Sequence, residues 1–155
     1  TMRDTILIVD PGQKAVSSSA GHGLMNRHDF ARERFSQAHR HTDQLLRAME
    51  EGDLEAFIRI TEQEALTLHG LMMSSDPGYI LIRPGTIQII NRVRNFREQN
   101  TLPLCFTLDA GPNVHLLYPE SVATEVEVFI REELLAFCDE KRMIADGVGN
   151  GPEAI

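Results

Sequence analysis

Residues 104–118 read LCFTLDAGPNVHLLY, and this stretch decides the fold. Its first part, 104–108, shows the two-residue alternation of a β-strand. The triplet GPN at 111–113 then reverses the chain, because glycine permits positive φ, proline fixes its own φ and asparagine tolerates left-handed geometry. An apolar run resumes at 114–118. The stretch therefore predicts a β-hairpin with Asp109 at the point where the first strand breaks into the turn.

Asp109 lies out of phase with the apolar residues of the first strand, so we expect its side chain to point away from the apolar face. A carboxylate on a rigid tip beside backbone amides can serve as a base or as a ligand. Aspartate is also common in hairpins simply because it hydrogen-bonds its own turn. The spacing alone leaves both interpretations open.

Strands and helices are predicted on both sides of this hairpin. In chain order, the pattern predicts a strand at 5–10, a polar helix at about 24–50, a helix from Asp53 as N-cap toward Met72, a short extended segment at 79–82, a helix at 86–99, an amphipathic helix from Val122 to Phe137 and a strand around 143–145. Strands separated by helices around one hairpin are typical of an α+β fold of the ferredoxin-like kind. We expect an antiparallel sheet covered by helices on one face, in a single domain of 155 residues.

The composition bears on partners and location. A hydrophobic content of 42% with 25% charged residues is that of a globular protein, and no apolar run approaches the roughly 20 residues of a membrane span. The net charge of −8 argues against nucleic acid as a partner, because phosphate contacts need a basic surface. Cys105 and Cys138 form no recognisable disulfide framework, which fits a reducing compartment. We therefore expect a cytoplasmic protein with neither a membrane nor a nucleic-acid partner.

The small-residue loop at 16–23 is a second candidate site. It contains Ser18 and Ser19 and precedes a predicted helix, whose first N–H groups and positive dipole end attract phosphate or carboxylate. Simple N-capping by one serine accounts for the same residues. No Gly-Lys-Ser/Thr follows, so the loop is not a Walker motif.

The histidines do not predict a metal site. His39 and His41 are two residues apart on a predicted helix and do not share a face, and no Cys or His pair elsewhere has zinc spacing. His69 is expected either to approach a substrate from a helix end or to be packed and hydrogen-bonded locally. His115 is expected to point to solvent or to a neighbouring helix.

Three segments, in the same order along the chain, resemble the C-terminal domain of the diphosphomevalonate decarboxylase family, within the GHMP kinase superfamily. They are KAVSSSAG at 14–21, FTLDAGPN at 106–113 and VGNGP at 148–152. The DAGPN motif is specific, and the other two segments support it. His69, followed by the Asp76–Pro77 break, also falls where the family has a histidine before a proline-containing loop.

The resemblance implies a reaction for a longer protein. In that family ATP phosphorylates the tertiary 3-hydroxyl of mevalonate 5-diphosphate, and loss of phosphate and carbon dioxide then gives isopentenyl diphosphate. It implies that Asp109 acts on that hydroxyl as base or orienter, and that Ser18, Ser19, Ala110 and Gly111 bind the substrate. ATP and Mg²⁺ are expected to be bound mainly by an N-terminal domain that this chain lacks. The chain alone is therefore expected to be inactive.

Three other functions stay open at the level of sequence. They are a non-catalytic ferredoxin-like binding module, a small-molecule kinase of the same superfamily, and a decarboxylase that acts on phosphomevalonate. The stretch 62–69 lacks the Asp-Ser-Asn or similar residues often seen there in the family, which leaves the substrate open. A homodimer is left open as well.

Overall fold

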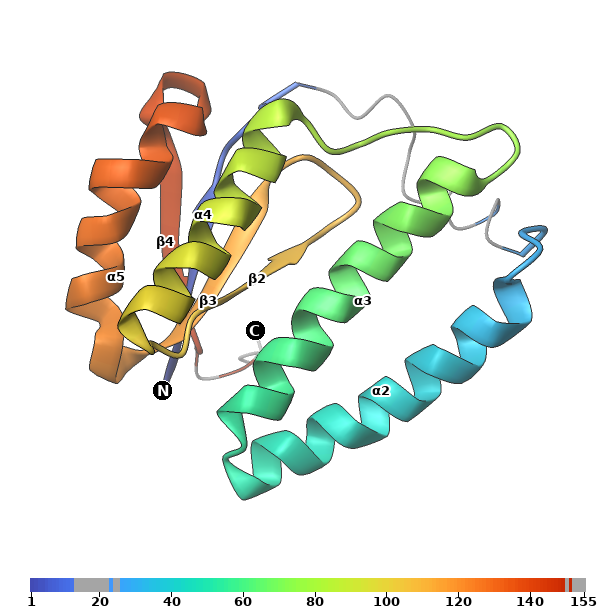
Figure 1. Ribbon diagram of the computed structural model, residues 1–155, viewed down its shortest axis with the longest axis horizontal. Coiled ribbons are helices and arrows are strands. Elements are labelled where there is room, and N and C mark those ends of the chain that lie inside the picture. The colour runs from blue at the N-terminus through green and yellow to red at the C-terminus, as the bar shows by residue number, and fades with distance from the viewer. Residues whose placement is uncertain (13–22, 24–25, 150, 152–155) are drawn as a thin grey trace, which may run out of the picture.

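The computed structural model describes residues 1–12, 23, 26–149 and 151. In chain order its main elements are β1 (Met2–Leu7), α2 (Ala31–Glu51), α3 (Leu54–Ser74), α4 (Pro84–Asn100), β2 (Cys105–Leu108), β3 (Val114–Pro119), α5 (Ala123–Phe129) and β4 (Met143–Gly147) (Figure 1). After α5 the chain continues through a π-helical turn, Ile130–Leu134, and short 3₁₀ turns before it reaches β4.

The four strands form one antiparallel sheet in the order β2-β3-β1-β4. Leu7 of β1 lies opposite Val114 on one side and Met143 on the other, while Phe106 of β2 lies opposite Leu116 of β3. Together with a helix after β1 and another after β3, this strand order is that of a ferredoxin-like fold. The predicted α+β class and the predicted hairpin are confirmed.

Helices α4 and α5 cover one face of the sheet (Figure 1). The strand residues that point to this face alternate with residues of the other face, as the pleat requires. They pack with apolar side chains of both helices into one core, whose largest buried members include Leu7, Phe106, Leu116, Tyr118, Ile89, Val93, Phe129, Ile130 and Leu134. Burial of apolar side chains such as these is the main term that favours the folded state.

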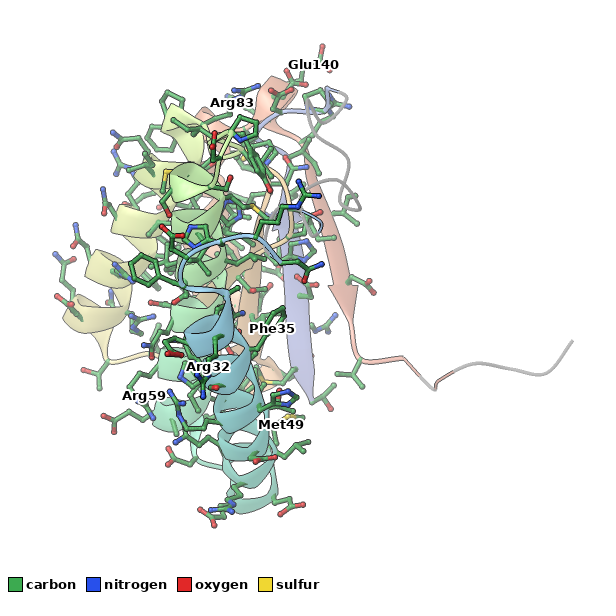
Figure 2. All side chains as sticks on the ribbon, turned by 90° about the vertical axis from the view of Figure 1, so that its right-hand side faces the viewer. Arg32, Phe35, Met49, Arg59, Arg83 and Glu140 are labelled. Carbon is green, nitrogen blue, oxygen red and sulfur yellow. The ribbon has the colours of Figure 1, made fainter. Side chains whose placement is uncertain are left out.

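Helix α3 lies along the edge strand β2, and α2 packs on the far side of α3 (Figures 1 and 2). Four residues of α3 at positions i, i+3, i+7 and i+10 are buried, as expected for one helix face. They are Glu62, Ala65, His69 and Met72. Two of these four are polar, so this face of α3 must find hydrogen-bond partners as well as packing partners.

Two predicted boundaries are wrong. Helix α2 begins at Ala31 instead of about residue 24, because His28 forms a turn before it: the Phe30 N–H donates to His28 Nδ1 (3.1 Å) and the Ala31 N–H to the His28 carbonyl (2.9 Å). Strand β1 spans Met2–Leu7 instead of 5–10. The next residues leave the sheet, and residues 79–82 join α3 to α4 without entering it.

His115 has a partner that the sequence did not predict. It lies on β3, and its Nδ1 is 3.0 Å from Asp4 Oδ2 on the neighbouring strand β1. The ring contacts a carboxylate of the sheet itself and is 25% exposed, so it is partly open to solvent as expected. The contact follows from register, because Asp4 lies opposite Leu117, two residues from His115.

Cys105 and Cys138 are free thiols, as expected from their spacing. Burial raises the pKa of Cys105 to about 12 and that of Cys138 to about 11. Both side chains are therefore neutral thiols at physiological pH, and neither has the thiolate character of a reactive cysteine.

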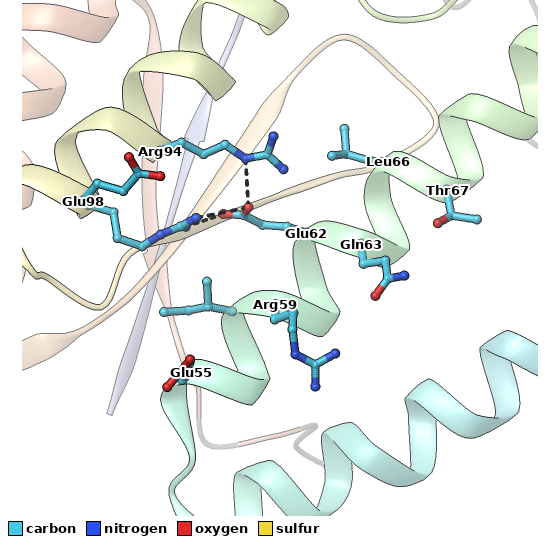
Figure 3. A pocket seen from close by; sticks show the side chains of 10 residues that line it. Glu55, Arg59, Glu62, Gln63, Leu66, Thr67, Arg94 and Glu98 are labelled. Atoms are coloured by element: carbon cyan, nitrogen blue, oxygen red, sulfur yellow. Dashed lines mark hydrogen bonds and ion pairs between the residues drawn. The ribbon is translucent and has the colours of Figure 1, made fainter.

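A buried carboxylate joins α3 to α4 (Figure 3). The side chain of Glu62 is only 7% exposed, and its oxygens accept hydrogen bonds from Arg97 Nη1 (2.5 Å) and Arg94 Nε (3.2 Å). The same Arg97 nitrogen donates to the carbonyl of Leu104, the residue before β2 (2.8 Å). One carboxylate and two arginines thus tie α3, α4 and the edge strand together.

We expect Arg97→Met to destabilise the domain by about 3–5 kcal/mol, because it leaves Glu62 buried with its better hydrogen-bond donor removed. The matched control is Arg131→Met, since Arg131 forms an exposed i,i+4 pair with Glu127. That pair contributes roughly 0–1 kcal/mol to the free energy of unfolding. Urea titration of both variants measures the difference, and equal losses of unfolding free energy in the two variants would contradict this account.

Candidate active site

Asp109 is exposed and directly follows the last residue of β2. That residue, Leu108, pairs with Val114 of β3 and closes the ladder of the hairpin. The five residues Asp109–Asn113 therefore form the turn, with the carboxylate at its first position. In Figure 1 the turn lies between α3 and the start of α4.

Both helices hold this turn by its backbone carbonyls. His69 of α3 donates from Nε2 to the carbonyl oxygen of Asp109 (2.9 Å). Thr86, in the first turn of α4, donates from its hydroxyl to the carbonyl oxygen of Pro112 (2.5 Å). The Thr86 hydroxyl also accepts the N–H of Arg83, which caps the start of α4 (3.2 Å). The two ends of the turn are thus attached to two different helices.

The turn is also attached to the segment that follows β1, through the side chain of Asn113. Its Oδ1 accepts the N–H groups of Val9 (2.9 Å) and Asp10 (3.2 Å). These two N–H groups therefore point to the turn and not to a neighbouring strand, which is why β1 stops short of its predicted end. The asparagine acts through its side-chain amide and not through a left-handed backbone, because Asn113 is not among the described residues with positive φ.

A second carboxylate, Asp10, is held beside this turn. Its Oδ1 accepts the N–H of Gly12 (2.8 Å) and its Oδ2 accepts Arg83 Nε (3.2 Å). The Gly12 amide, and after it the Arg83 guanidinium, lower the pKa of Asp10. Figure 2 shows Arg83 at the upper end of the molecule, remote from Met49 near the end of α2.

His69 is 3% exposed, so it is packed within the protein and not presented to a substrate. A carbonyl oxygen can only accept a hydrogen bond, so the Nε2 atom of His69 must carry the hydrogen. Burial lowers the pKa of His69, opposed by its hydrogen bond to the Asp109 carbonyl and by the Asp109 carboxylate. Of the two expected roles, local packing with a hydrogen bond is the one observed.

Three of the five predicted site residues meet in this turn: Asp109, Ala110 and Gly111. The other two, Ser18 and Ser19, lie outside the described residues. The Gly111 N–H donates to the Asp109 carbonyl (2.8 Å), so this amide is used within the turn. The roles assigned to these five residues stay predictions.

Four residues that support the turn were not predicted from the sequence. They are Asp10, Arg83, Thr86 and, as a side-chain ligand of the backbone, Asn113. Thr86 carried a local signal, because a threonine two residues after Pro84 suits the first turn of a helix. The others act across long separations in sequence, for which a single chain carries no local signal.

Neither a metal cluster nor a charged pocket adds to the site among the described residues. No group of three or more His, Cys, Asp or Glu side chains there could hold a metal ion. A groove between α3 and α4 is lined by Arg59, Leu66, Arg94 and Arg97, but the last two arginines are already bound to Glu62 (Figure 3).

Within the same described part, every helix is too short or too polar to cross a membrane.

The model of the mevalonate 5-diphosphate decarboxylase C-terminal domain family matches residues 5–154. The chain belongs to this family. A phosphomevalonate decarboxylase of Haloferax volcanii is 29% identical over 122 residues, which cover 79% of this chain and 36% of that protein. The family expected from the DAGPN motif is thereby confirmed.

Solved decarboxylase structures share the fold. A mevalonate pyrophosphate decarboxylase from Streptococcus pyogenes superimposes with a TM-score of 0.86 at 21% identity, covering 99% of this chain and 46% of that one. MDDEF in complex with MVAPP, AMPPCP and magnesium superimposes with a TM-score of 0.82 at 23% identity, covering 93% and 43%. This decarboxylase-family domain thus spans about a third of the curated relative and less than half of each solved one.

The lowered pKa of His69 predicts how the free energy of unfolding changes with pH. The unfolded chain binds a proton near the ordinary pKa of about 6.5, whereas the folded chain binds it only at lower pH. The unfolded state then carries more bound protons below pH 6.5, so the stability that neutral His69 contributes is present above that pH and falls as the pH drops toward the folded pKa.

We therefore expect the wild-type domain to lose more unfolding free energy than His69→Gln between pH 7.5 and 5, because glutamine does not titrate. Urea titrations at several pH values measure both proteins. Parallel stability curves over this range would show that burial of His69 does not perturb its titration.

Proposed function

We propose that this chain is the C-terminal domain of an ATP-dependent decarboxylase that converts mevalonate 5-diphosphate to isopentenyl diphosphate, ADP, phosphate and carbon dioxide. The observation that carries the proposal is the exposed carboxylate of Asp109, which begins a turn held by α3, by α4 and by the segment after β1. Membership of the decarboxylase family supports it. A rigidly held carboxylate suits a reaction in which one hydroxyl group must be aligned with a phosphoryl donor.

Asp109 acts in this proposal on the tertiary 3-hydroxyl of the substrate. Its carboxylate accepts the hydroxyl proton while the oxygen takes the γ-phosphoryl group of ATP. The C3–O bond to the new phosphate then breaks, and the electron pair of the C1–C2 bond forms the C2–C3 double bond as carbon dioxide leaves. The negative charge of Asp109 stabilises the positive character that develops at C3.

The substrate and the nucleotide are assigned to different parts of the longer protein. We assign Ser18, Ser19, Ala110 and Gly111 to the substrate, and ATP with Mg²⁺ mainly to a preceding N-terminal domain. One observation supports this division: a relative of about twice this length binds AMPPCP and magnesium together with MVAPP. AMPPCP is an analogue of ATP. The partner of this domain is then that N-terminal domain.

Phosphomevalonate is the second candidate substrate. The curated relative that is 29% identical to this chain is a phosphomevalonate decarboxylase, whereas the solved relatives named above are decarboxylases of the diphosphate or bind MVAPP. The two substrates differ by one phosphate, so the Asp109 chemistry is the same for both. Values of kcat/KM of the full-length protein for the two compounds distinguish them.

We expect Asp109→Ala in the full-length protein to lower kcat by at least about 10²-fold, the usual size of a general-base contribution. Asp43→Ala is the matched control, because Asp43 is an exposed carboxylate on α2. Release of carbon dioxide and formation of ADP measure turnover in each variant. Near-normal turnover of the Asp109 variant would remove Asp109 from the mechanism.

Product analysis tests the reaction class independently. The full-length protein is expected to form ADP and carbon dioxide in equal amounts, and the isolated domain is expected to form neither. A stable phosphate ester without carbon dioxide would instead identify a kinase of the superfamily. Binding of the substrate with no ADP formed by the full-length protein would favour a non-catalytic binding module.

A further inference from the structure

His69 of helix α3 contacts the backbone of Asp109, the proposed catalytic residue. His69 lies five residues before the end of α3, on the buried face that also carries Glu62. Its Nε2–H donates to the Asp109 carbonyl oxygen at 2.9 Å. The same oxygen accepts the Gly111 N–H at 2.8 Å, so it has both of its lone pairs occupied.

These bonds determine the direction of the Asp109 side chain. On the N-terminal side of Asp109, the ladder pair of Leu108 with Val114 holds the backbone. On the C-terminal side, a fixed carbonyl oxygen fixes the whole plane of the following peptide group, because the peptide bond is planar. With both flanking peptide planes held, the Cα–Cβ bond of Asp109 has one direction.

The hydrogen bonds of the turn are not interchangeable in this respect. The Gly111 N–H belongs to the turn itself and would move with it. Thr86 holds Pro112, three residues further on. Among the described residues, His69 attaches the Asp109 carbonyl to a helix, and its rigid ring is 3% exposed.

We propose that His69 is a positioning residue for the reaction, which holds the Asp109 carboxylate in line with the substrate hydroxyl through the Asp109 carbonyl. The inference rests on the proposed function of Asp109. His69 is too deeply buried to contact the substrate, so it acts only through Asp109. Loss of this bond lets the turn shift, and a displacement of about 1 Å at a reacting group can cost about 10²-fold in rate.

The test uses the full-length protein with His69→Leu, which removes the donor, and His69→Gln, whose amide nitrogen can take the place of Nε2. We expect His69→Leu to lower kcat about 10- to 100-fold with KM for the substrate within about 3-fold, since substrate binding by other groups is unchanged. His69→Gln is expected to regain most of the lost kcat.

The matched control is His41→Leu. His41 is a second buried histidine, on α2, and its ring contacts Glu64 of α3, on a face of that helix remote from Asp109. Its replacement is expected to lower the melting temperature while kcat stays within about 2-fold of wild type. An equal loss of kcat in His41→Leu and His69→Leu would show a general effect of destabilisation and would overturn the proposal.

A double variant separates this proposal from that of the catalytic role. In an Asp109→Asn background, His69→Leu is expected to cause no further loss of kcat, because its effect passes through Asp109. Full additivity of the two losses overturns the positioning role. Normal kcat in His69→Leu with at least a 10²-fold loss in Asp109→Asn overturns it too and leaves the proposed function standing, whereas normal kcat in Asp109→Asn overturns the proposed function itself.

If His69→Leu does not fold, His69→Asn replaces it in the comparison with His69→Gln. The shorter asparagine amide lies near the position of Nδ1 and does not reach the carbonyl. A kcat about 10-fold lower for Asn than for Gln supports the proposal, and equal kcat values overturn it.

Discussion

The buried carboxylate of Glu62 is the constraint on which the position of α3 depends. An unpaired charge in the interior is unfavourable by several kcal/mol, so Glu62 can be buried only where both arginines of α4 reach it. Arg97 in turn binds the Leu104 carbonyl at the edge of the sheet. This arrangement fixes the distance and the rotation of α3 relative to β2, which apolar packing alone specifies less sharply.

The rotation of α3 matters because the same helix face carries His69, seven residues after Glu62. Two turns of helix separate the two side chains, so orienting one orients the other. Glu62 sets the helix against β2, and His69 then meets the carbonyl of Asp109. The element that stabilises the edge of the sheet is thus also the element that reaches the proposed site.

The Asp109 turn shows how a short loop is made rigid. Five residues between two strands are attached to α3 by His69, to α4 by Thr86 and to the segment after β1 by Asn113. Each of these three attachments is a neutral hydrogen bond in which a backbone group takes part, so none of them uses the Asp109 carboxylate itself. The backbone that carries the exposed Asp109 side chain is thereby held in place, which suits the proposed role of Asp109 in phosphoryl transfer.

Local features of the sequence specify the class of fold, the hairpin and the family. Strand alternation, turn residues and the DAGPN motif are all local patterns, and the matched family confirms what they predicted. The burial of His69 against Asp109, the end of β1 beside Asn113 and the link that Glu62 makes between two helices depend instead on tertiary packing. These contacts connect residues 32 to 104 positions apart, and their partners are set by helix rotation and strand register, which no local pattern encodes.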